Sequence, residues 1–415
     1  MNKLHKYAFS DLYDMTSGIS STKEQAGHGS PFVSFSTVFN NYFLPDELSE
    51  LMDTSIREQE IYSIKKGDIL ITRTSETVDE LAMSCVALKE YPKATYSGFV
   101  KRLRPKTTGI AYDKYMAFFL RSKYFRKVIN SNTIMTLRAS FNEDIFSFLT
   151  LYLPDYDEQV KIGDMLYNIE KKIQLNKRIN DNLQQQIRMF YDYWFTQFDF
   201  PDVNGNPYKS SGGAMVWNDI LNREIPACWE VDKLMNIVSW ESNSQPPKSE
   251  FVYEPKEGYI RFIQNRDYDS DNHKTYIPYT KNLSTVDRFD ILMDKYGDAG
   301  AVRYGIEGAF NVALGKINVN RPNYQEYIRS FLESDGVYSY LHNSCMASTR
   351  ASLNESNLSM LNVVIPDEET LCAYQLQIRK IRESILLTND ENLQLENLRN
   401  WLLPMLMNGQ AMVQD

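Results

Sequence analysis

The chain has 415 residues with 43% hydrophobic and 13% aromatic residues, which predicts roughly two to four domains with packed cores and excludes bulk disorder. The net charge of -9 argues against a protein that coats nucleic acid over its whole surface. No apolar run is long enough for a signal peptide or a membrane span, and the four cysteines are widely spaced, so a reducing cytoplasm is the simplest compartment.

The first 150 residues combine strands with a helix. Short apolar runs bounded by polar residues or glycine predict strands at Asp68–Thr72, Ala82–Lys89 and Phe99–Leu103. The spacing of aromatic and aliphatic residues predicts a helix over Tyr112–Asn130. We therefore expect a mixed α/β domain in this part of the chain.

A basic segment covers the end of this region. Between residues 89 and 138 twelve residues are basic and only two, Glu90 and Asp113, are acidic. This imbalance predicts an electropositive surface for several phosphates, with an ordinary solvated basic face as the alternative. Because side chains alternate along a strand, Arg102 and Arg104 should share one face and Lys101 should lie on the other. The candidate DNA-binding residues here are Arg73, Thr74, Lys101, Arg102 and Arg104.

A helix of about 40 residues is predicted from near Asp157 to near Phe198. At 1.5 Å per residue it would be roughly 60 Å long, which fits a coiled-coil partner better than an ordinary globular helix. Its apolar residues follow alternating steps of three and four, and Asn176 and Asn180 fill a gap in this seam. The seam residues predicted for helix pairing or partner docking are Ile162, Leu166, Ile169, Ile173, Asn180, Leu183 and Ile187.

A turn-rich connection, Asp202–Gly213 (DVNGNPYKSSGG), precedes a second mixed region from about Ala214 to Pro366. Within it Phe289–Met293 (FDILM) resembles Gly67–Ile71 (GDILI) of the first region. This second region is not basic overall. Any DNA contacts there would depend on individual residues, of which we select Lys295, Arg303 and Arg350.

The chain also contains an internal repeat. Residues 138–155 (RASFNEDIFSFLTLYLPD) and 350–367 (RASLNESNLSMLNVVIPD) align without a gap, and half of their positions are identical. A period of 212 residues indicates duplicated domains rather than a solenoid. The helical seam recurs after the second copy, where its predicted pairing residues are Ile378, Ile381, Ile385, Asn392 and Leu395. Two such helices most simply pack on each other, and the alternative is that each packs only on its own domain.

Both copies of the repeat begin with Arg-Ala-Ser. An arginine beside a hydroxyl group is a common reader of phosphate or guanine, so Arg138, Ser140, Arg350 and Ser352 are further candidate DNA-binding residues. An arginine paired inside each domain, where strand meets helix, explains the tripeptide equally well.

No catalytic motif is found in the sequence. The Asp/Asn-Pro-Pro-aromatic loop of DNA amino-methyltransferases, a Gly-rich cofactor loop and a Walker motif are all missing. The acidic residues that follow Pro154 are better explained as helix caps than as a nuclease site. The four histidines have no metal-ligand spacing. We therefore expect neither catalysis nor a metal site in this chain.

Several longer motifs resemble a known family, the DNA-specificity subunit of type I restriction–modification enzymes. The similarity covers nearly the whole chain. The motifs that carry it are Leu153–Gln159 (LPDYDEQ) with the helix after it, Tyr191–Phe198, Gly205–Gly213 (GNPYKSSGG), Glu224–Glu230 (EIPACWE), Gly67–Leu70 and Leu402–Leu406 (LLPML). The departures are small, such as Cys228 in place of a glycine before Trp-Glu.

The resemblance implies an α+β fold with two mixed α/β target-recognition domains separated by two long antiparallel coiled-coil helices. The corresponding boundaries are 1–154 and 214–366 for the recognition domains, 155–200 and 367–408 for the helices, and 201–213 for the linker. Each domain would recognise one half of a split site in double-stranded DNA.

The resemblance also implies partners. The chain would itself be non-catalytic and would direct two methyltransferase subunits and restriction/translocase subunits, which would bring S-adenosylmethionine and Mg-ATP. The alternatives are a combined methyltransferase–nuclease and a coiled-coil adaptor without a DNA role. The DNA target depends on a few loop side chains and cannot be predicted from the sequence.

Overall fold

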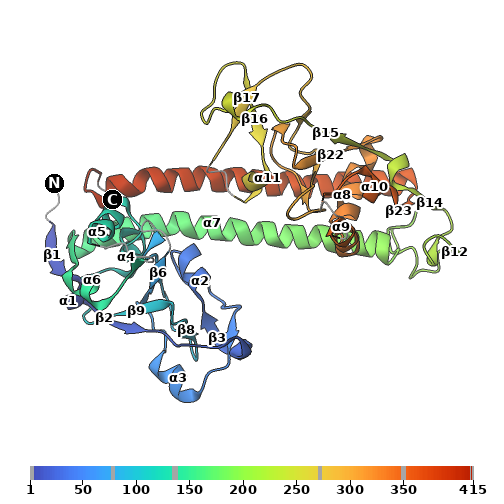
Figure 1. The fold of residues 1–415 in the computed structure, drawn as a ribbon. Helices are drawn as coiled ribbons and strands as arrows, with labels where there is room; N and C mark the ends of the chain where they lie inside the picture. The colour runs from blue at the N-terminus through green and yellow to red at the C-terminus, as the bar shows by residue number, and fades with distance from the viewer. Residues whose placement is uncertain are drawn as a thin grey trace. The chain divides into compact units, whose positions relative to one another are not determined.

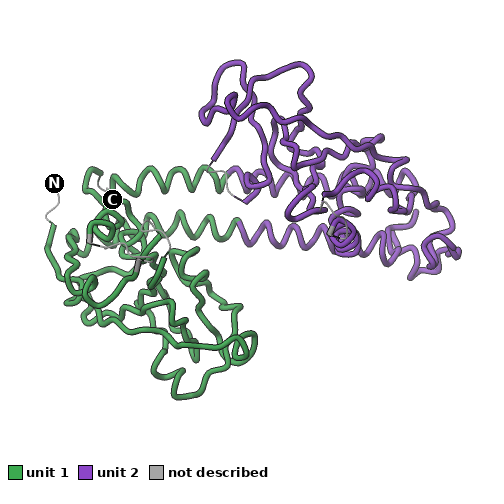
Figure 2. Tube along the Cα trace, viewed as in Figure 1, with its two compact units in different colours: residues 1–176, 391–415 green, residues 177–390 purple. Residues whose placement is uncertain are grey.

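The structure is a computed structural model that describes residues 4–75, 80–132, 139–269, 273–346, 352–411 and 413. The chain forms two compact units, which Figure 2 colours separately. Unit 1 contains residues 1–176 and 391–415, and unit 2 contains residues 177–390. Within the described ranges no helix has the length and apolar character needed to cross a bilayer.

Unit 1 contains a four-stranded antiparallel sheet in the order β2-β9-β5-β7 and a three-stranded sheet in the order β4-β3-β8, in which β3 and β8 are parallel. Two short pairs, β1-β11 and β10-β6, complete its strands within the described residues. The elements, visible in Figure 1, are β1 (His5–Ala8), α1 (Phe9–Leu12), β2 (Tyr13–Ser17), β3 (Ala26–Val33), α2 (Phe35–Asn40), β4 (Leu51–Met52), α3 (Ile56–Ile61), β5 (Ile69–Thr72), β6 (Thr74–Ser75), β7 (Ser84–Val86), β8 (Thr95–Tyr96), β9 (Val100–Pro105), α4 (Asp113–Phe119), α5 (Lys123–Asn132), β10 (Ala139–Ser140), α6 (Glu143–Phe148), β11 (Thr150–Leu153) and the start of α7 (Tyr156–Tyr191).

Strand β5 explains why a continuous apolar run forms a strand here. Ile69 and Ile71 belong to the core that also contains Phe118 and Leu166, whereas Leu70 belongs to a second core around Tyr96. Side chains alternate between the two faces of a strand, so an apolar run without alternation is what a strand buried on both faces requires.

Unit 2 has the corresponding sheets, β15-β22-β19-β20 and β17-β16-β21-β18, and the pairs β12-β13 and β14-β23. Its elements are the π-helical end of the first long helix (Asp192–Thr196), β12 (Met215–Asn218), β13 (Arg223–Pro226), β14 (Glu230–Lys233), β15 (Val238–Ser242), β16 (Tyr259–Ile263), β17 (Tyr276–Pro278), β18 (Thr285–Val286), β19 (Ile291–Asp294), β20 (Val302–Arg303), β21 (Gly308–Phe310), β22 (Leu314–Val319), α8 (Gln325–Glu333), α9 (Asp335–Met346), α10 (Glu355–Ser359), β23 (Asn362–Ile365) and α11 (Glu368–Met407), with short 3-10 turns at Leu234–Asn236, Lys248–Glu250, Asn265–Tyr268 and Pro322–Tyr324.

The two units repeat one plan over a longer stretch than the sequence repeat indicates. Helix α4 begins at Asp113 and α8 begins at Gln325, 212 residues later, and the same interval relates α5 to α9, α6 to α10 and β11 to β23. In both units the middle strand of the four-stranded sheet has the same neighbours, and the second sheet contains one parallel pair, β3-β8 or β16-β21. The expectation of duplicated α/β domains is confirmed.

The two long helices pair antiparallel within each unit. In unit 1 Arg399 of α11 bonds Glu170 of α7 at 2.5 Å, and Asn392 of α11 accepts from Asn176 at 2.9 Å. In unit 2 the Asn180 amide donates to Asn389 at 2.7 Å, and Trp194 lies 5.6 Å from Tyr374 between ring centroids. The buried asparagine therefore does bond across the seam, but Asn392 is bonded to Asn176 and not to Asn180, with which the repeat had aligned it.

The seam also packs on the domains. Ile162 and Leu166 belong to the core of unit 1, and Ile187, Ile378 and Ile385 belong to the core of unit 2. The two interpretations of the helical stripe are therefore both correct, since each helix contacts its domain and the other helix. The remaining seam residues, Ile169, Leu183, Ile381 and Leu395, are half-buried, and Ile173 is buried.

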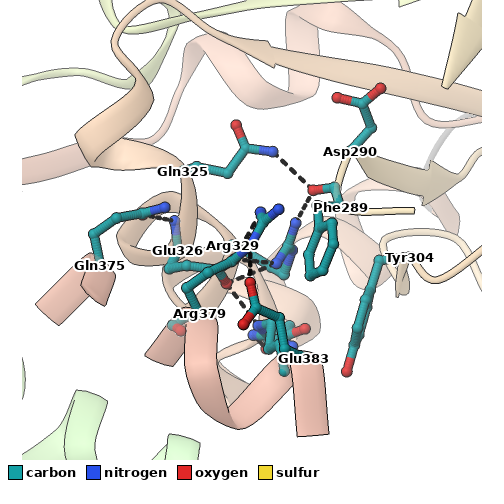
Figure 3. Close-up of polar contacts among 12 residues, drawn as sticks. Phe289, Asp290, Tyr304, Gln325, Glu326, Arg329, Gln375, Arg379 and Glu383 are labelled. Atoms are coloured by element: carbon teal, nitrogen blue, oxygen red, sulfur yellow. Dashed lines mark hydrogen bonds and ion pairs between the residues drawn. The ribbon is translucent and has the colours of Figure 1, made fainter. Parts of the chain in front are cut away.

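A buried ion cluster ties α8 to α11 in unit 2 (Figure 3). Arg329 bonds both oxygens of Glu326, at 2.8 and 2.6 Å, and also donates to the Phe289 carbonyl. Arg382 of α11 donates to Glu326 and to Glu333, both at 2.7 Å. Glu326, Arg329 and Arg382 have no exposed side-chain surface, so each charge depends on the others for compensation.

Some predicted elements need correction. The helix expected over Tyr112–Asn130 is two helices, α4 and α5, because the chain turns at residues 120–122, where the Ser122 hydroxyl bonds the Phe119 carbonyl and accepts from the Phe125 N–H. The strand expected over Ala82–Lys89 is limited to β7 (Ser84–Val86). The first long helix ends as expected near Phe198, after a π-helical turn in which Trp194 and Phe195 are buried.

Candidate nucleic-acid interface

In unit 1 three candidate residues meet where β5 ends. Arg73 is exposed, its N–H donates to the Phe99 carbonyl at 2.8 Å, and its own carbonyl accepts from the Phe141 N–H at 2.8 Å. Thr74 and Ser140 are direct partners in the β6-β10 pair. The main chain therefore holds Arg73, Thr74 and Ser140 together. We call this cluster, with Lys101, the unit 1 face.

Unit 2 builds the same arrangement from different side chains. The Lys295 N–H donates to the Ala313 carbonyl at 2.8 Å, and the Lys295 carbonyl accepts from the Leu353 N–H at 3.0 Å. Ser352, just before Leu353, is half-buried beside this contact, and Tyr296 after Lys295 is exposed. We call Lys295, Tyr296 and Ser352 the unit 2 face. One backbone frame thus presents a basic residue and a hydroxyl in each unit.

Lys101 lies close to Arg73 on the unit 1 face. Its residue is 7% exposed, and burial, followed by the positive charge of Arg73, lowers the pKa of the Lys101 ammonium, while Glu143 opposes this effect. Two neighbouring cations are stabilised when an anion such as phosphate binds beside them. Arg73 is the exposed member of this pair, and Lys101 adds positive potential beneath it.

Arg102 and Arg104 do share one face of β9, since both donate to the Ser63 carbonyl. They do not form a free basic face, however. Arg102 is 6% exposed and also bonds the Ile61 carbonyl, and Arg104 makes a bidentate ion pair with the fully buried Asp68 at 2.8 and 2.6 Å. Their bonds explain them as structural residues, and we remove both from the candidate DNA face.

The wider basic segment is also largely used inside the domain. Seven of its twelve basic side chains bond groups of the protein itself. These are Lys89 (Asp46), Lys106 (Asp14), Lys114 (Asp164), Arg104 (Asp68), and Arg102, Arg121 and Arg126, which bond backbone carbonyls. The excess of basic residues in the sequence therefore overstates the positive surface.

In unit 2 Arg303 is partnered as well. Its guanidinium donates to Asp294 at 3.1 and 2.8 Å and to Asp298 at 3.3 Å. Burial is the largest influence on Asp294 and raises its carboxyl pKa, which the bond from Arg303 opposes. This ion pair leaves Lys295 as the cation of the unit 2 face. The other two predicted arginines, Arg138 and Arg350, lie outside the described residues.

The sequence analysis missed a set of apolar side chains that the long helices expose. They lie off the paired seam, so a search restricted to alternating steps of three and four could not select them. In unit 1 they are Leu175, Leu393, Leu398 and Trp401, and in unit 2 they are Ile179, Met189, Leu376 and Leu387. We call them the exposed helix residues. Exposed apolar groups in such number are typical of a protein-binding surface.

Comparison with protein families gives a match over most of the chain. The model of the family described as "Type I restriction modification DNA specificity domain" matches residues 7–185 and 226–397. These two segments coincide with the two copies of the repeated plan.

Curated relatives and a solved structure agree with this match. The chain is 23% identical to the type I restriction enzyme MjaIX specificity subunit of Methanocaldococcus jannaschii, over 95% of this chain and 89% of the relative. It is 22% identical to the HindI specificity subunit of Haemophilus influenzae, over 91% of this chain and 94% of the relative. Its fold is similar to the crystal structure of a type I restriction–modification S subunit from M. genitalium, with a TM-score of 0.61, 14% identity and coverage of 98% and 96%.

Proposed function

The chain belongs to the family of type I restriction-modification DNA specificity domains, and we propose that its unit 1 face and unit 2 face each bind one half of a bipartite DNA site. The observation that carries the proposal is the frame found once in each unit. In both, a basic residue follows the middle strand and is bonded through its carbonyl to the residue after the Arg-Ala-Ser serine. Cations and hydroxyls held by rigid backbone are the groups that bind phosphates and base edges.

The chain is a specificity subunit and not an enzyme. The family that it matches is a DNA specificity domain, not a methyltransferase or nuclease catalytic family, and the curated relatives are specificity subunits. In the proposed reaction this chain selects the DNA, and chemistry occurs on other subunits. The S-adenosylmethionine and Mg-ATP required for methylation and translocation would be bound there, in the cytoplasm.

The exposed helix residues are the proposed contact for those subunits. They occur on both long helices, and Trp401, Leu387 and Leu376 are each more than half exposed. Aromatic and aliphatic anchors of this kind contribute most of the binding energy in protein interfaces. Because the repeat supplies one set in each unit, we expect two methyltransferase subunits per chain.

The test is DNA binding by the chain assembled with its methyltransferase subunits. The methylome of cells carrying this complex identifies the site, and duplexes with both half-sites, with either half alone and with neither are then compared by filter binding. We expect both halves to be needed for tight binding, and a binding constant that falls with salt.

Two outcomes would favour the other functions. A coiled-coil adaptor would show no salt-sensitive retention of any duplex. A combined methyltransferase–nuclease would transfer radiolabelled methyl groups as the pure chain, without partner subunits. The variant Arg379→Ala, on a long helix away from both faces, is the control for non-specific loss of binding.

A further inference from the structure

An exposed phenylalanine lies at the unit 1 face. Phe99 is 61% exposed, although it sits between Tyr96 and Val100, which are both fully buried. Its carbonyl accepts the Arg73 N–H bond that positions the unit 1 face. An exposed phenyl ring costs free energy in water, so a single one beside the cation of a binding face needs a reason.

The backbone beneath this ring is fixed. The Phe99 N–H donates to the Ser97 hydroxyl at 3.2 Å, and the Val100 N–H donates to the Ser97 carbonyl at 2.9 Å. Ser97 itself is bonded to the Val33 carbonyl at 3.0 Å, and a Cβ atom on Gly98 would lie only 3.0 Å from the Ile19 carbonyl oxygen. The turn is therefore rigid, whereas the ring at its tip is exposed to solvent.

Unit 2 contains the same turn with a different residue at its tip. The Ala313 N–H donates to the Asn311 side chain at 3.1 Å, the Leu314 N–H donates to the Asn311 carbonyl at 3.1 Å, and the Ala313 carbonyl accepts from Lys295. Asn311, Ala313 and Leu314 thus occupy the places of Ser97, Phe99 and Val100. The two faces differ at this position by a phenyl ring against a methyl group.

We propose that Phe99 is a specificity-determining residue whose ring contacts the C5-methyl group of a thymine in the half-site bound by unit 1, while Ala313 leaves that contact out of the other half-site. The inference rests on the proposed function. The thymine methyl is the one apolar group on the base edges in the major groove, and phenylalanine is among the side chains that bind it. Arg73 and Thr74 beside the ring supply bonds to the neighbouring phosphate and polar edges.

The experiment uses the complex with its methyltransferase subunits and duplexes in which each thymine of both half-sites is replaced, one at a time, by deoxyuridine. This change removes only the C5-methyl group. For one thymine we expect binding by the unchanged complex to weaken about three- to fivefold, the effect of losing one buried methyl group. Phe99→Ala should bind the thymine duplex less tightly and be indifferent to the replacement at that position.

Controls separate this outcome from general damage. Phe99→Leu should keep part of the response, and Ala313→Phe should leave the response at the Phe99 thymine unchanged. The proposal is overturned if Phe99→Ala binds as tightly as the unchanged complex, or if it loses affinity while responding to every deoxyuridine as the unchanged complex does. The latter result would indicate a ring inserted between base steps instead. Failure of the proposed function would differ, because the unchanged complex would then prefer no site.

Discussion

The two units share a backbone plan but invert the charges where each domain meets its long helix. In unit 1 Arg121 donates to the carbonyls of Ser84, Val38, Phe39 and Asn41, and Glu170 of α7 is bonded to Arg399. The positions 212 residues later carry Glu333 and Arg382, which form an ion pair at 2.7 Å. The plan is therefore fixed by apolar packing and turns, while the charges have diverged as matched sets that suit each domain to its own helix.

The two binding faces differ in the same way. Arg73 and Lys101 place two cations on the unit 1 face, with Glu143 as a nearby acid. In unit 2 Arg303 is held by Asp294 and Asp298, which leaves Lys295 beside nearly neutral surroundings. We expect unit 1 to depend more on phosphate contacts and unit 2 more on neutral bonds to the bases.

The largest expected effect comes from breaking the buried cluster of unit 2. Arg382→Ala leaves Glu326 with one arginine fewer in a site without solvent, and it should lower the free energy of unfolding by about 3–5 kcal/mol. Urea denaturation of the chain measures this change. The matched control is Glu383→Ala on the same helix, whose exposed pair with Arg379 should contribute less than about 0.5 kcal/mol. Equal losses in the two variants would contradict the account.

Arg104→Ala tests the corrected role of β9. It leaves the buried Asp68 carboxylate without its guanidinium, so stability should fall by about 3 kcal/mol while the salt dependence of DNA binding stays the same. Combining it with Asp68→Asn removes the stranded charge and should recover part of the loss. A salt slope that flattens in Arg104→Ala would return this side chain to the DNA face.

The asparagine pair of unit 1 should have a smaller effect. Asn392→Leu leaves the Asn176 amide with Glu391 but without its second partner, which should cost about 1–2 kcal/mol. Replacing both asparagines by leucine should recover this stability and weaken the control of helix register. Urea denaturation measures the first effect. A double variant less stable than the single one would show that the amides do more than pair with each other.

Arg73→Ala should have the smallest effect, on DNA binding alone. The slope of log K against log salt should fall by about 1, as for one lost phosphate contact, and stability should be unchanged. Lys316→Ala provides a control, since Lys316 pairs with Asp290 inside unit 2 at 2.8 Å and should not alter the slope. Filter binding over a salt series distinguishes the two variants, and identical slopes would remove Arg73 from the DNA.

The sequence predicted the parts of the fold that have a regular period. The repeat was visible after Asp113 because α4 through α11 follow α8 at one constant interval in the alignment of the two copies, and the long helices were visible from their seam. Earlier in each copy the interval varies, because Asp68 corresponds to Asp290 but Ser97 corresponds to Asn311. Without a constant interval the shared sheets and turns could not be aligned by eye.

The binding face was predicted in part. Arg73, Thr74 and Ser140 were selected and do lie together, as do Lys295 and Ser352. Arg102 and Arg104 were selected on charge alone, which gives no information about the carbonyls and the buried Asp68 that bind them. Phe99 was missed since an apolar residue at the start of a predicted strand does not differ in the sequence from one that enters the core.

The central claim is that the two units bind different halves of one DNA site. The most direct test replaces Arg73, and in a second variant Lys295, by the photo-crosslinking residue p-benzoylphenylalanine in the assembled complex. Irradiation with the target duplex is followed by mapping of the attached bases. The account predicts that position 73 attaches only within one half-site and position 295 only within the other. Attachment of both positions to the same half, or to random positions along the duplex, would contradict it.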